Sequence, residues 1–393
     1  MNYLVIDTEC SGAIKNKAHP FDPENKLLLL GERGPDFRRI SSRDDLLSND
    51  GAALLDLEHR LRNAGFLVGF NLKFDLHWLR TLDISFKGIN IWDCQLAEFI
   101  LENQKKTYPS LQEACRKYAL PSKKDTISLY LDIGLDVSDI PLQELTEYLE
   151  ADLISTEALF EVQLSLIKER GYWDLFRLQC QDLLILEEME YNGIKFDHNR
   201  AQELAQVCRN REAEICEKLS SFFHNTPFVI NWASTDHLSA ILYGGLISYT
   251  IKEPIGFYKT GAKAGLPKFK NVDMVYKFQR LVEPREQDRL KKDGFWSTAE
   301  DVLRELPAKG VAKDIIECVL ELSSLQKLSG TYYEGIPKKF ELYGWKDGIM
   351  HGQINQCVAI TGRTSSSNPN LQNIPSEVKE CFVSRYNDEN ITQ

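Results

Sequence analysis

The sequence predicts an α/β domain at the N-terminus, followed by a mostly α-helical region and a small α+β segment. In the first 172 residues, short apolar stretches alternate with stretches of helical spacing, which is typical of α/β layers. From Trp173 onward long helical patterns replace that alternation, and after Gly344 the chain becomes polar and rich in turn formers. We therefore expect three regions: residues 1–172, 173–345 and 346–393.

The N-terminal region begins with a short apolar run that ends at Asp7 and predicts the first strand. Gly65 and Gly171 mark the expected ends of two helices, because glycine commonly follows a helix C-terminus. The predicted strands cover residues 2–6, 26–31 and 66–70, and the predicted helices cover residues 44–64, 111–118 and 142–170.

The second region has predicted helices at residues 173–191, 199–223, 298–306 and 311–328. Between them, residues 252–292 hold eleven basic and five acidic residues, a local net charge of +6. Gly256, Gly261, Gly265 and Pro267 interrupt any regular pattern in this basic insert. We expect an inserted, irregular basic loop.

Composition excludes several classes of protein. The 393 residues, 43% hydrophobic and 27% charged, suit two or three folded domains and not a disordered chain. No apolar run approaches the roughly 20 residues that span a bilayer, and the N-terminus shows no secretory signal, so we expect a cytoplasmic protein without a membrane partner. The nine cysteines include no C-x-x-C pair, which argues against a disulfide framework or a thiolate zinc site.

The net charge of −11 speaks against nucleic acid as a partner when it is taken as an average. Clustered acids can instead serve a metal. Asp7 and Glu9 stand two residues apart at the first strand, so their side chains share one face, about 6–7 Å apart. Two acids that point together repel each other unless a cation lies between them, and oxygen ligands favour Mg²⁺ or Mn²⁺. A solvated strand end is the alternative for this pair alone.

Two further clusters accompany this pair. Asn71 and Asp75, in GFNLKFD, follow a strand and open a predicted helix, on which they share a face. Tyr148 and Asp152 are four residues apart on a later predicted helix and therefore also share a face. A nearby acid, Asp93, is expected to cap the helix that follows it.

The ordered set D-x-E, N-x-x-x-D and Y-x-x-x-D resembles the DEDD superfamily of 3′→5′ exonucleases, in its tyrosine-bearing branch. Position 147, where the other branch has histidine, holds Glu147. The resemblance implies a ribonuclease H-like fold in which Asp7, Glu9, Asp75 and Asp152 hold two divalent ions, Mg²⁺ or Mn²⁺. It also implies that Tyr148 orients the attacking water and that Asn71 contacts the single-stranded 3′ end of DNA.

The string T-G-R-x-S-S-x-x-P-N-L-Q-N-I-P, within residues 355–375, resembles the start of the palm in family A DNA polymerases, the DNA polymerase I type. The likeness covers residues 1–251 and 293–393 and not the basic insert, and it implies that the helical region is the thumb. The implied contacts to primer–template DNA are Arg363, Asn370, Gln372 and Asn373 in the palm motif.

Physical chemistry gives these side chains a role. Every base pair presents minor-groove acceptors at similar positions, so donors such as Arg363, Gln372 and Asn373 can hold any correctly paired duplex. Lys327, Ser329 and Thr331, at the expected thumb turn, are predicted phosphate contacts, with a solvated helix end as the alternative. The basic insert is predicted to add salt-dependent DNA binding, the alternatives being a solvated loop or a docking site for another replication protein.

The family's palm acid motifs D-x-S-x-x-E and H-D-E do not occur in this sequence. We therefore expect the N-terminal half of a split, phage-like family A polymerase that acts in a bacterial host cytoplasm. A second polypeptide would carry the remaining palm and the fingers and would pair with an otherwise unpartnered strand at residues 381–384. A split gene, a processed split-intein precursor and a shortened piece of a longer chain remain alternatives.

The leading hypothesis is thus a proofreading exonuclease and primer–template-binding subunit. One alternative is a stand-alone exoribonuclease of the ribonuclease D kind, which shares the pattern of the first 170 residues. The other is a non-catalytic DNA-binding processivity subunit. The palm motif argues against the first alternative, and the complete set of acids argues against the second.

Overall fold

The computed structural model describes residues 2–48, 51–122 and 126–385. The chain divides into two compact units. Unit 1 comprises residues 1–200 together with 336–393, and unit 2 comprises residues 201–335. The predicted division near residue 172 falls inside unit 1, because the helix that follows it packs against earlier helices of that unit. The three-part division by function stays a prediction.

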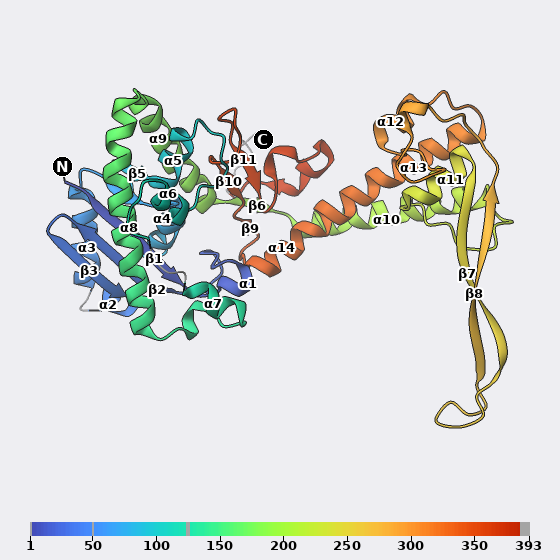
Figure 1. The fold of residues 1–393 in the computed structure, drawn as a ribbon, viewed down its shortest axis with the longest axis horizontal. Coiled ribbons are helices and arrows are strands. Elements are labelled where there is room, and N and C mark those ends of the chain that lie inside the picture. Colours follow the sequence, from blue (N-terminus) through green and yellow to red (C-terminus); the bar gives the residue numbers. More distant parts are fainter. Residues whose placement is uncertain (1, 49–50, 123–125, 386–393) are drawn as a thin grey trace. The chain divides into compact units, whose positions relative to one another are not determined.

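Unit 1 is built on a mixed five-stranded sheet (Figure 1). The strand order of this sheet is β3-β2-β1-β4-β5. The first strand pairs antiparallel with β2 and parallel with β4, and the sheet therefore combines a hairpin edge with a parallel edge. The strands are β1 (Leu4–Cys10), β2 (Leu27–Gly34), β3 (Phe37–Ser42), β4 (Leu67–Gly69) and β5 (Ile91–Asp93).

Helices pack against this sheet and enclose its core. The longest helix, α8, packs against β1 and β2, while α9 packs against α4, α5 and β5. Val5, Ile6, Leu30, Val68 and Trp92 are fully buried between these layers. The helices are α1 (Ala13–Asn16), α2 (Arg43–Leu47), α3 (Ala52–Asn63), α4 (Leu72–Arg80), α5 (Cys94–Leu101), α6 (Leu111–Lys117), α7 (Ile127–Asp132), α8 (Leu142–Glu169) and α9 (Trp173–Asn192).

The sequence predicted one helix over residues 44–64, and this was wrong: α2 and α3 are separate. The amide of Ser48 bonds back to the carbonyl of Asp45, and Gly51 adopts a left-handed φ of 80° just before α3. Glycine tolerates that conformation without a Cβ clash, so the chain turns there. The strand β3 was not predicted.

The C-terminal part of unit 1 adds two small sheets. One has the order β12-β6-β9, and the other is the pair β10–β11. The prediction that the strand at residues 381–384 lacks sheet neighbours was wrong, because Phe382 pairs with Phe196 and Val383 pairs with Lys195. The elements are β6 (Ile194–Phe196), α14 (Gly335–Tyr343), β9 (Ile349–Met350), β10 (Gln353–Asn355), β11 (Ser365–Ser367) and β12 (Phe382–Val383).

Unit 2 has its own apolar core, formed by α10 to α13 and the base of a long hairpin. Leu219, Ile241 and Ile315 are fully buried in that core. A π-helical turn at Leu328–Tyr333 follows α13. The elements are α10 (His198–Ser221), α11 (Thr235–Tyr243), β7 (Gly245–Phe257), β8 (Pro267–Phe278), α12 (Glu300–Glu305) and α13 (Val311–Lys327).

The prediction of an irregular loop in the basic insert was wrong for residues 252–278, which belong to the antiparallel hairpin β7–β8. Gly256 lies at a bulge where the register shifts, and Gly261 and Gly265 lie in the turn, so the glycines shape the hairpin instead of breaking it. Among the described residues, no helix combines the length and apolar character that a bilayer crossing needs.

Candidate active site

The two acids of β1 lie inside that strand and not at its end. Asp7 lies opposite Gly31 of β2 and Glu9 lies opposite Leu29, so both side chains leave the sheet on the same face. Glu9 is buried, and Asp7 is partly exposed. The prediction that these two residues share a face is confirmed.

Gly31 explains how α8 comes close to this face. A Cβ atom at Gly31 would lie 2.6 Å from Cδ1 of Leu153 and 3.1 Å from Cγ of Leu149. Both leucines are buried in α8, so no free space would accept the extra atom. The missing side chain therefore lets α8 lie directly over β2, and Asp152 stands next to Leu153 on that helix.

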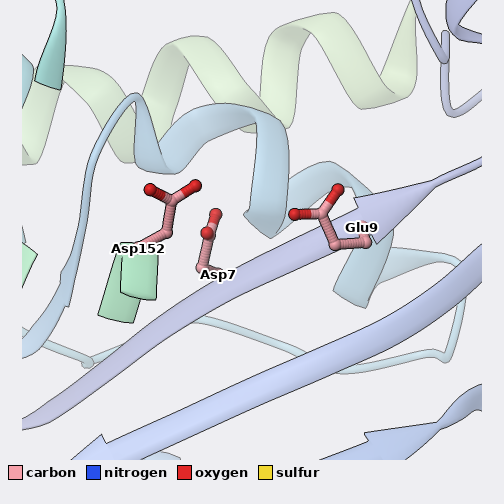
Figure 2. A group of neighbouring side chains, drawn as sticks. All are labelled: Asp7, Glu9 and Asp152. Carbon is pink, nitrogen blue, oxygen red and sulfur yellow. The ribbon is translucent and has the colours of Figure 1, made fainter. Parts of the chain in front are cut away.

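Asp7, Glu9 and Asp152 form one carboxylate cluster (Figure 2). One carboxylate oxygen from each residue lies within 4.8 Å of the others. Glu9 and Asp152 are buried, which limits the screening of their charges by water. Three such groups held together repel one another and favour a bound cation.

Asp75, the fourth predicted ligand, lies beside this cluster on α4. The hydroxyl of Thr8, between the two acids of β1, donates a 2.6 Å hydrogen bond to Oδ1 of Asp75. Burial raises the pKa of the Asp75 carboxyl well above its usual range, and the negative charge of Asp7 raises it further. Asp75 is not among the residues whose oxygens lie within 4.8 Å of one another. Its carboxyl is nevertheless close enough to Asp7 for their negative charges to interact.

Asp93 fixes the start of α4 as well as that of α5. Its carboxylate accepts hydrogen bonds from the backbone amide of Leu96 at 2.9 Å and from that of Leu72 at 2.7 Å. The predicted cap of the following helix is therefore confirmed. The bond to Leu72 was not predicted, and it ties the helix that carries Asp75 to the end of β5.

Two further predicted residues stand near these acids in the chain. Tyr148 is partly buried one helical turn before Asp152 on α8, so the two side chains share a face. Asn71 is exposed at the N-terminal cap of α4, with a left-handed φ of 57°. Their roles with water and DNA stay predictions.

The donor set fits a hard divalent cation. All four candidate ligands are carboxylates, which suit Mg²⁺ and Mn²⁺ better than softer metals. Three of them already offer oxygen atoms to one space.

The palm-like motif lies in unit 1 around β10 and β11. Arg363, Asn370, Gln372 and Asn373 are all exposed. The Asn370 side chain accepts a 3.1 Å hydrogen bond from the backbone amide of Gln372, and the amide group of Gln372 donates to the backbone oxygen of Thr364. These local bonds hold the loop in shape and leave its polar side chains on the surface.

The three predicted phosphate contacts of unit 2 differ in exposure. Lys327 at the end of α13 and Thr331 in the π-helical turn are exposed. Ser329 is buried, with 6% of its surface exposed, which weighs against a direct contact with DNA.

Thr8 and Gly31 are the two residues of the site that sequence analysis missed. Thr8 stands between Asp7 and Glu9, and its alternation to the other face of β1 is a signal that could have pointed to a partner there. Gly31 is identified only by its register with Asp7, which depends on how β1 and β2 pair.

The sequence of residues 270–392 matches the protein family described as DNA polymerase family A. The chain is similar to DNA polymerase I of Chloroflexus aurantiacus, with 29% identity over 328 residues that make up 80% of this chain and 30% of the relative. DNA polymerase I of Bacillus subtilis is 28% identical over 77% of this chain and 29% of its own length. The chain thus spans less than a third of the length of these curated relatives.

One solved structure extends the likeness to the fold. It is described as the POL domain of Pol1 from M. smegmatis in complex with DNA primer-template and dNTP. The TM-score is 0.64 at 18% identity, and the match covers 97% of this chain and 54% of that one. The chain is accordingly similar to family A DNA polymerases, in sequence over residues 270–392 and in fold.

Proposed function

We propose that unit 1 is a metal-dependent 3′→5′ exodeoxyribonuclease and that the chain holds primer–template DNA as part of a family A DNA polymerase. The observation that carries the nuclease is the cluster of Asp7, Glu9 and Asp152, with ligand oxygens within 4.8 Å of one another. The relationship to DNA polymerase I supports DNA as the substrate and proofreading as the purpose.

In this proposal Asp7, Glu9, Asp152 and Asp75 hold two Mg²⁺ or Mn²⁺ ions. Bound divalent ions supply a nucleophile at neutral pH and stabilise charge on the entering and leaving oxygens of a phosphodiester. The hydroxyl of Tyr148 forms a hydrogen bond with the attacking water and orients it. Thr8 holds the Asp75 carboxylate in place through its 2.6 Å hydrogen bond to Oδ1.

The DNA-binding groups of the proposal lie on surfaces that the fold leaves exposed. Asn71 contacts the single-stranded 3′ end beside α4. Arg363, Asn370, Gln372 and Asn373 follow the duplex minor groove, whose acceptors look alike in all base pairs. Lys327 and Thr331 contact phosphates and add affinity without sequence preference.

The test of substrate uses single-stranded DNA and RNA of one sequence, each labelled at the 5′ end, with Mg²⁺ present. We expect a ladder of shortening DNA products and at least about tenfold slower loss of RNA. Equal or faster RNA degradation would favour an exoribonuclease of the ribonuclease D kind. No metal-dependent degradation of either strand would favour a non-catalytic DNA-binding subunit.

Nucleotidyl transfer requires carboxylates that hold metals opposite the primer end and the incoming triphosphate. The motifs D-x-S-x-x-E and H-D-E are not present in these 393 residues. We therefore propose that these residues alone shorten primers and do not extend them, and that extension requires palm and finger residues from outside this sequence. The test is primer extension by the Asp7→Ala variant, which suppresses digestion; robust nucleotide addition would contradict the proposal.

A further inference from the structure

The hairpin β7–β8 extends well beyond the helices of unit 2 (Figure 1). Only its base is packed: Ile247 and Phe278 are buried, and Phe228 stacks on Tyr249 with ring centroids 4.9 Å apart. Farther from the base, in the outer half of the hairpin, every residue from Lys252 to Asn271 is exposed. The outer half of the hairpin therefore gains no stability from the core of unit 2, and its composition is free to serve another purpose.

One face of this outer half carries aromatic rings. Phe257 lies opposite Pro267, and Phe269 lies opposite Pro254, so that the two phenyl rings are diagonal neighbours on one face. Their exposed fractions are 67% and 50%. Tyr258 follows at the start of the turn. Packing within unit 2 does not account for exposed rings at the end of this hairpin. Exposed apolar groups gathered in one place are typical of interaction surfaces.

The charge around these rings has one sign. Residues 254–272 contain Lys259, Lys263, Lys268 and Lys270 and no acid, in a chain whose net charge is −11. Among the residues that the structure describes, none of these four lysines forms an ion pair. Lysines also protect exposed strand edges from pairing with other chains, but that role does not require exposed rings.

We propose that the tip of this hairpin, residues 254–272, binds single-stranded nucleic acid. Phe257, Phe269 and Tyr258 stack on bases, while the four lysines attract the phosphates. A duplex would use only the lysines, because its base faces are already stacked inside the helix. Single-stranded DNA uses both features of the tip, and the absence of acids between residues 254 and 272 suits its uniform negative charge. This inference does not rest on the proposed hydrolysis.

The experiment measures binding of a fluorescent, closed circular oligo(dT) by anisotropy, with the whole chain and EDTA present. A circle has no 3′ end, so the proposed exonuclease site does not hold it as a substrate. The test variant is Phe257→Ala with Phe269→Ala. Its matched control is Leu246→Ala with Val275→Ala, two exposed apolar residues nearer the base of the same hairpin.

We expect the ring variant to bind the circle at least about tenfold more weakly and to bind a blunt duplex as the wild type does. The control should match the wild type on both ligands. Exchange of the four lysines for glutamine should weaken binding of both the circle and the duplex. For the circle, the slope of log affinity against log salt concentration should become shallower by about 0.7 for each phosphate that the lysines no longer neutralise. Melting curves should be unchanged, since these side chains lie outside the core.

Unchanged affinity of the ring variant for the circle would overturn the proposal. So would ring-dependent binding of a fluorescent polyglutamate peptide by a chain that does not bind the circle, because the partner would then be an acidic protein. Failure of the proposed nuclease activity would show in the degradation assay with 5′-labelled strands and would not affect the binding measurement with the circle.

Discussion

The carboxylate cluster of unit 1 and the β7–β8 hairpin of unit 2 are built in opposite ways. The cluster brings together residues 7, 9 and 152 and depends on the pairing of β1 with β2 and the close approach of α8. The hairpin is formed by neighbouring segments, and its outer half packs against nothing that the structure describes. A substitution in the elements that support the cluster should therefore alter the cluster from a distance. A substitution at the hairpin tip should alter only the tip.

The largest expected effect comes from the cluster itself. Asp152→Asn removes one charged ligand and should lower metal-dependent DNA degradation about 10³-fold, because metal binding and the stabilisation it gives disappear together. The matched control is Glu150→Gln on the same helix, a partly exposed residue that pairs with Arg38. It should retain near-normal activity. Equal losses in the two variants would mean that general charge, and not the cluster, matters.

A change at Gly31 tests whether long-range packing builds the cluster. Gly31→Ala places a Cβ 2.6 Å from Leu153, and the resulting shift of α8 should lower activity by up to about a hundredfold. Leu153→Ala in the same chain makes room for the new atom and should restore part of the activity, although its cavity lowers the melting temperature further. If the activity of the single and the double variant simply followed their melting temperatures, long-range packing would not be what builds the cluster.

The pH dependence of stability should report on a buried histidine of unit 1. Burial lowers the pKa of His77 from 6.5 to about 3, with Lys73 adding to the effect. The folded state therefore binds fewer protons, so this contribution to stability is complete above pH 6.5 and is lost as the pH falls from 6.5 toward 3.

The variant His77→Gln should remove that contribution. Between pH 7 and pH 5 the wild type should lose about 2 kcal/mol more stability than the variant, at about 1.4 kcal/mol per pH unit below about pH 6.5. Urea unfolding at the two pH values measures the difference. His59→Gln, at an exposed position, is the control and should leave the wild-type loss unchanged. The same loss in the His77 variant would show that His77 is not the source.

The smallest effect is expected at Tyr148. Tyr148→Phe keeps the packing of the ring on α8 and removes only the hydroxyl that is proposed to orient water, so degradation should slow about tenfold. Binding of the circular oligonucleotide by the hairpin should not change. A loss as large as that of Asp152→Asn would mean that Tyr148 does more than orient water.

Local patterns in the sequence predicted much of unit 1. The spacing of Asp7 and Glu9 fixes their common face, and Asp93 stands where a cap is expected; both predictions are confirmed. The helices of unit 1 were largely found because apolar spacing alone defines them. The break between α2 and α3 was missed because the leucines on both sides keep one helical pattern across it.

The features that sequence analysis missed depend on pairing. The importance of Gly31 appears only when β2 lies beside β1, and Asp93 meets Leu72 only when β5 lies beside β4. In the hairpin, a bulge at Gly256 and a turn with Gly261 look like irregular chain until the two strands are paired, so the glycines wrongly predicted a loop. Exposed rings at a strand tip have no periodic signature at all.

The central proposal is that Asp7, Glu9 and the carboxylates beside them make unit 1 a metal-dependent 3′→5′ exodeoxyribonuclease. The most direct measurement follows 5′-labelled single-stranded DNA with time, with Mg²⁺ or EDTA, for the wild type and for Asp7→Ala with Glu9→Ala. We expect stepwise shortening from the 3′ end by the wild type only with Mg²⁺, and at least about 10³-fold slower shortening by the double variant with its melting curve preserved. Shortening by the folded double variant at the wild-type rate would contradict the account.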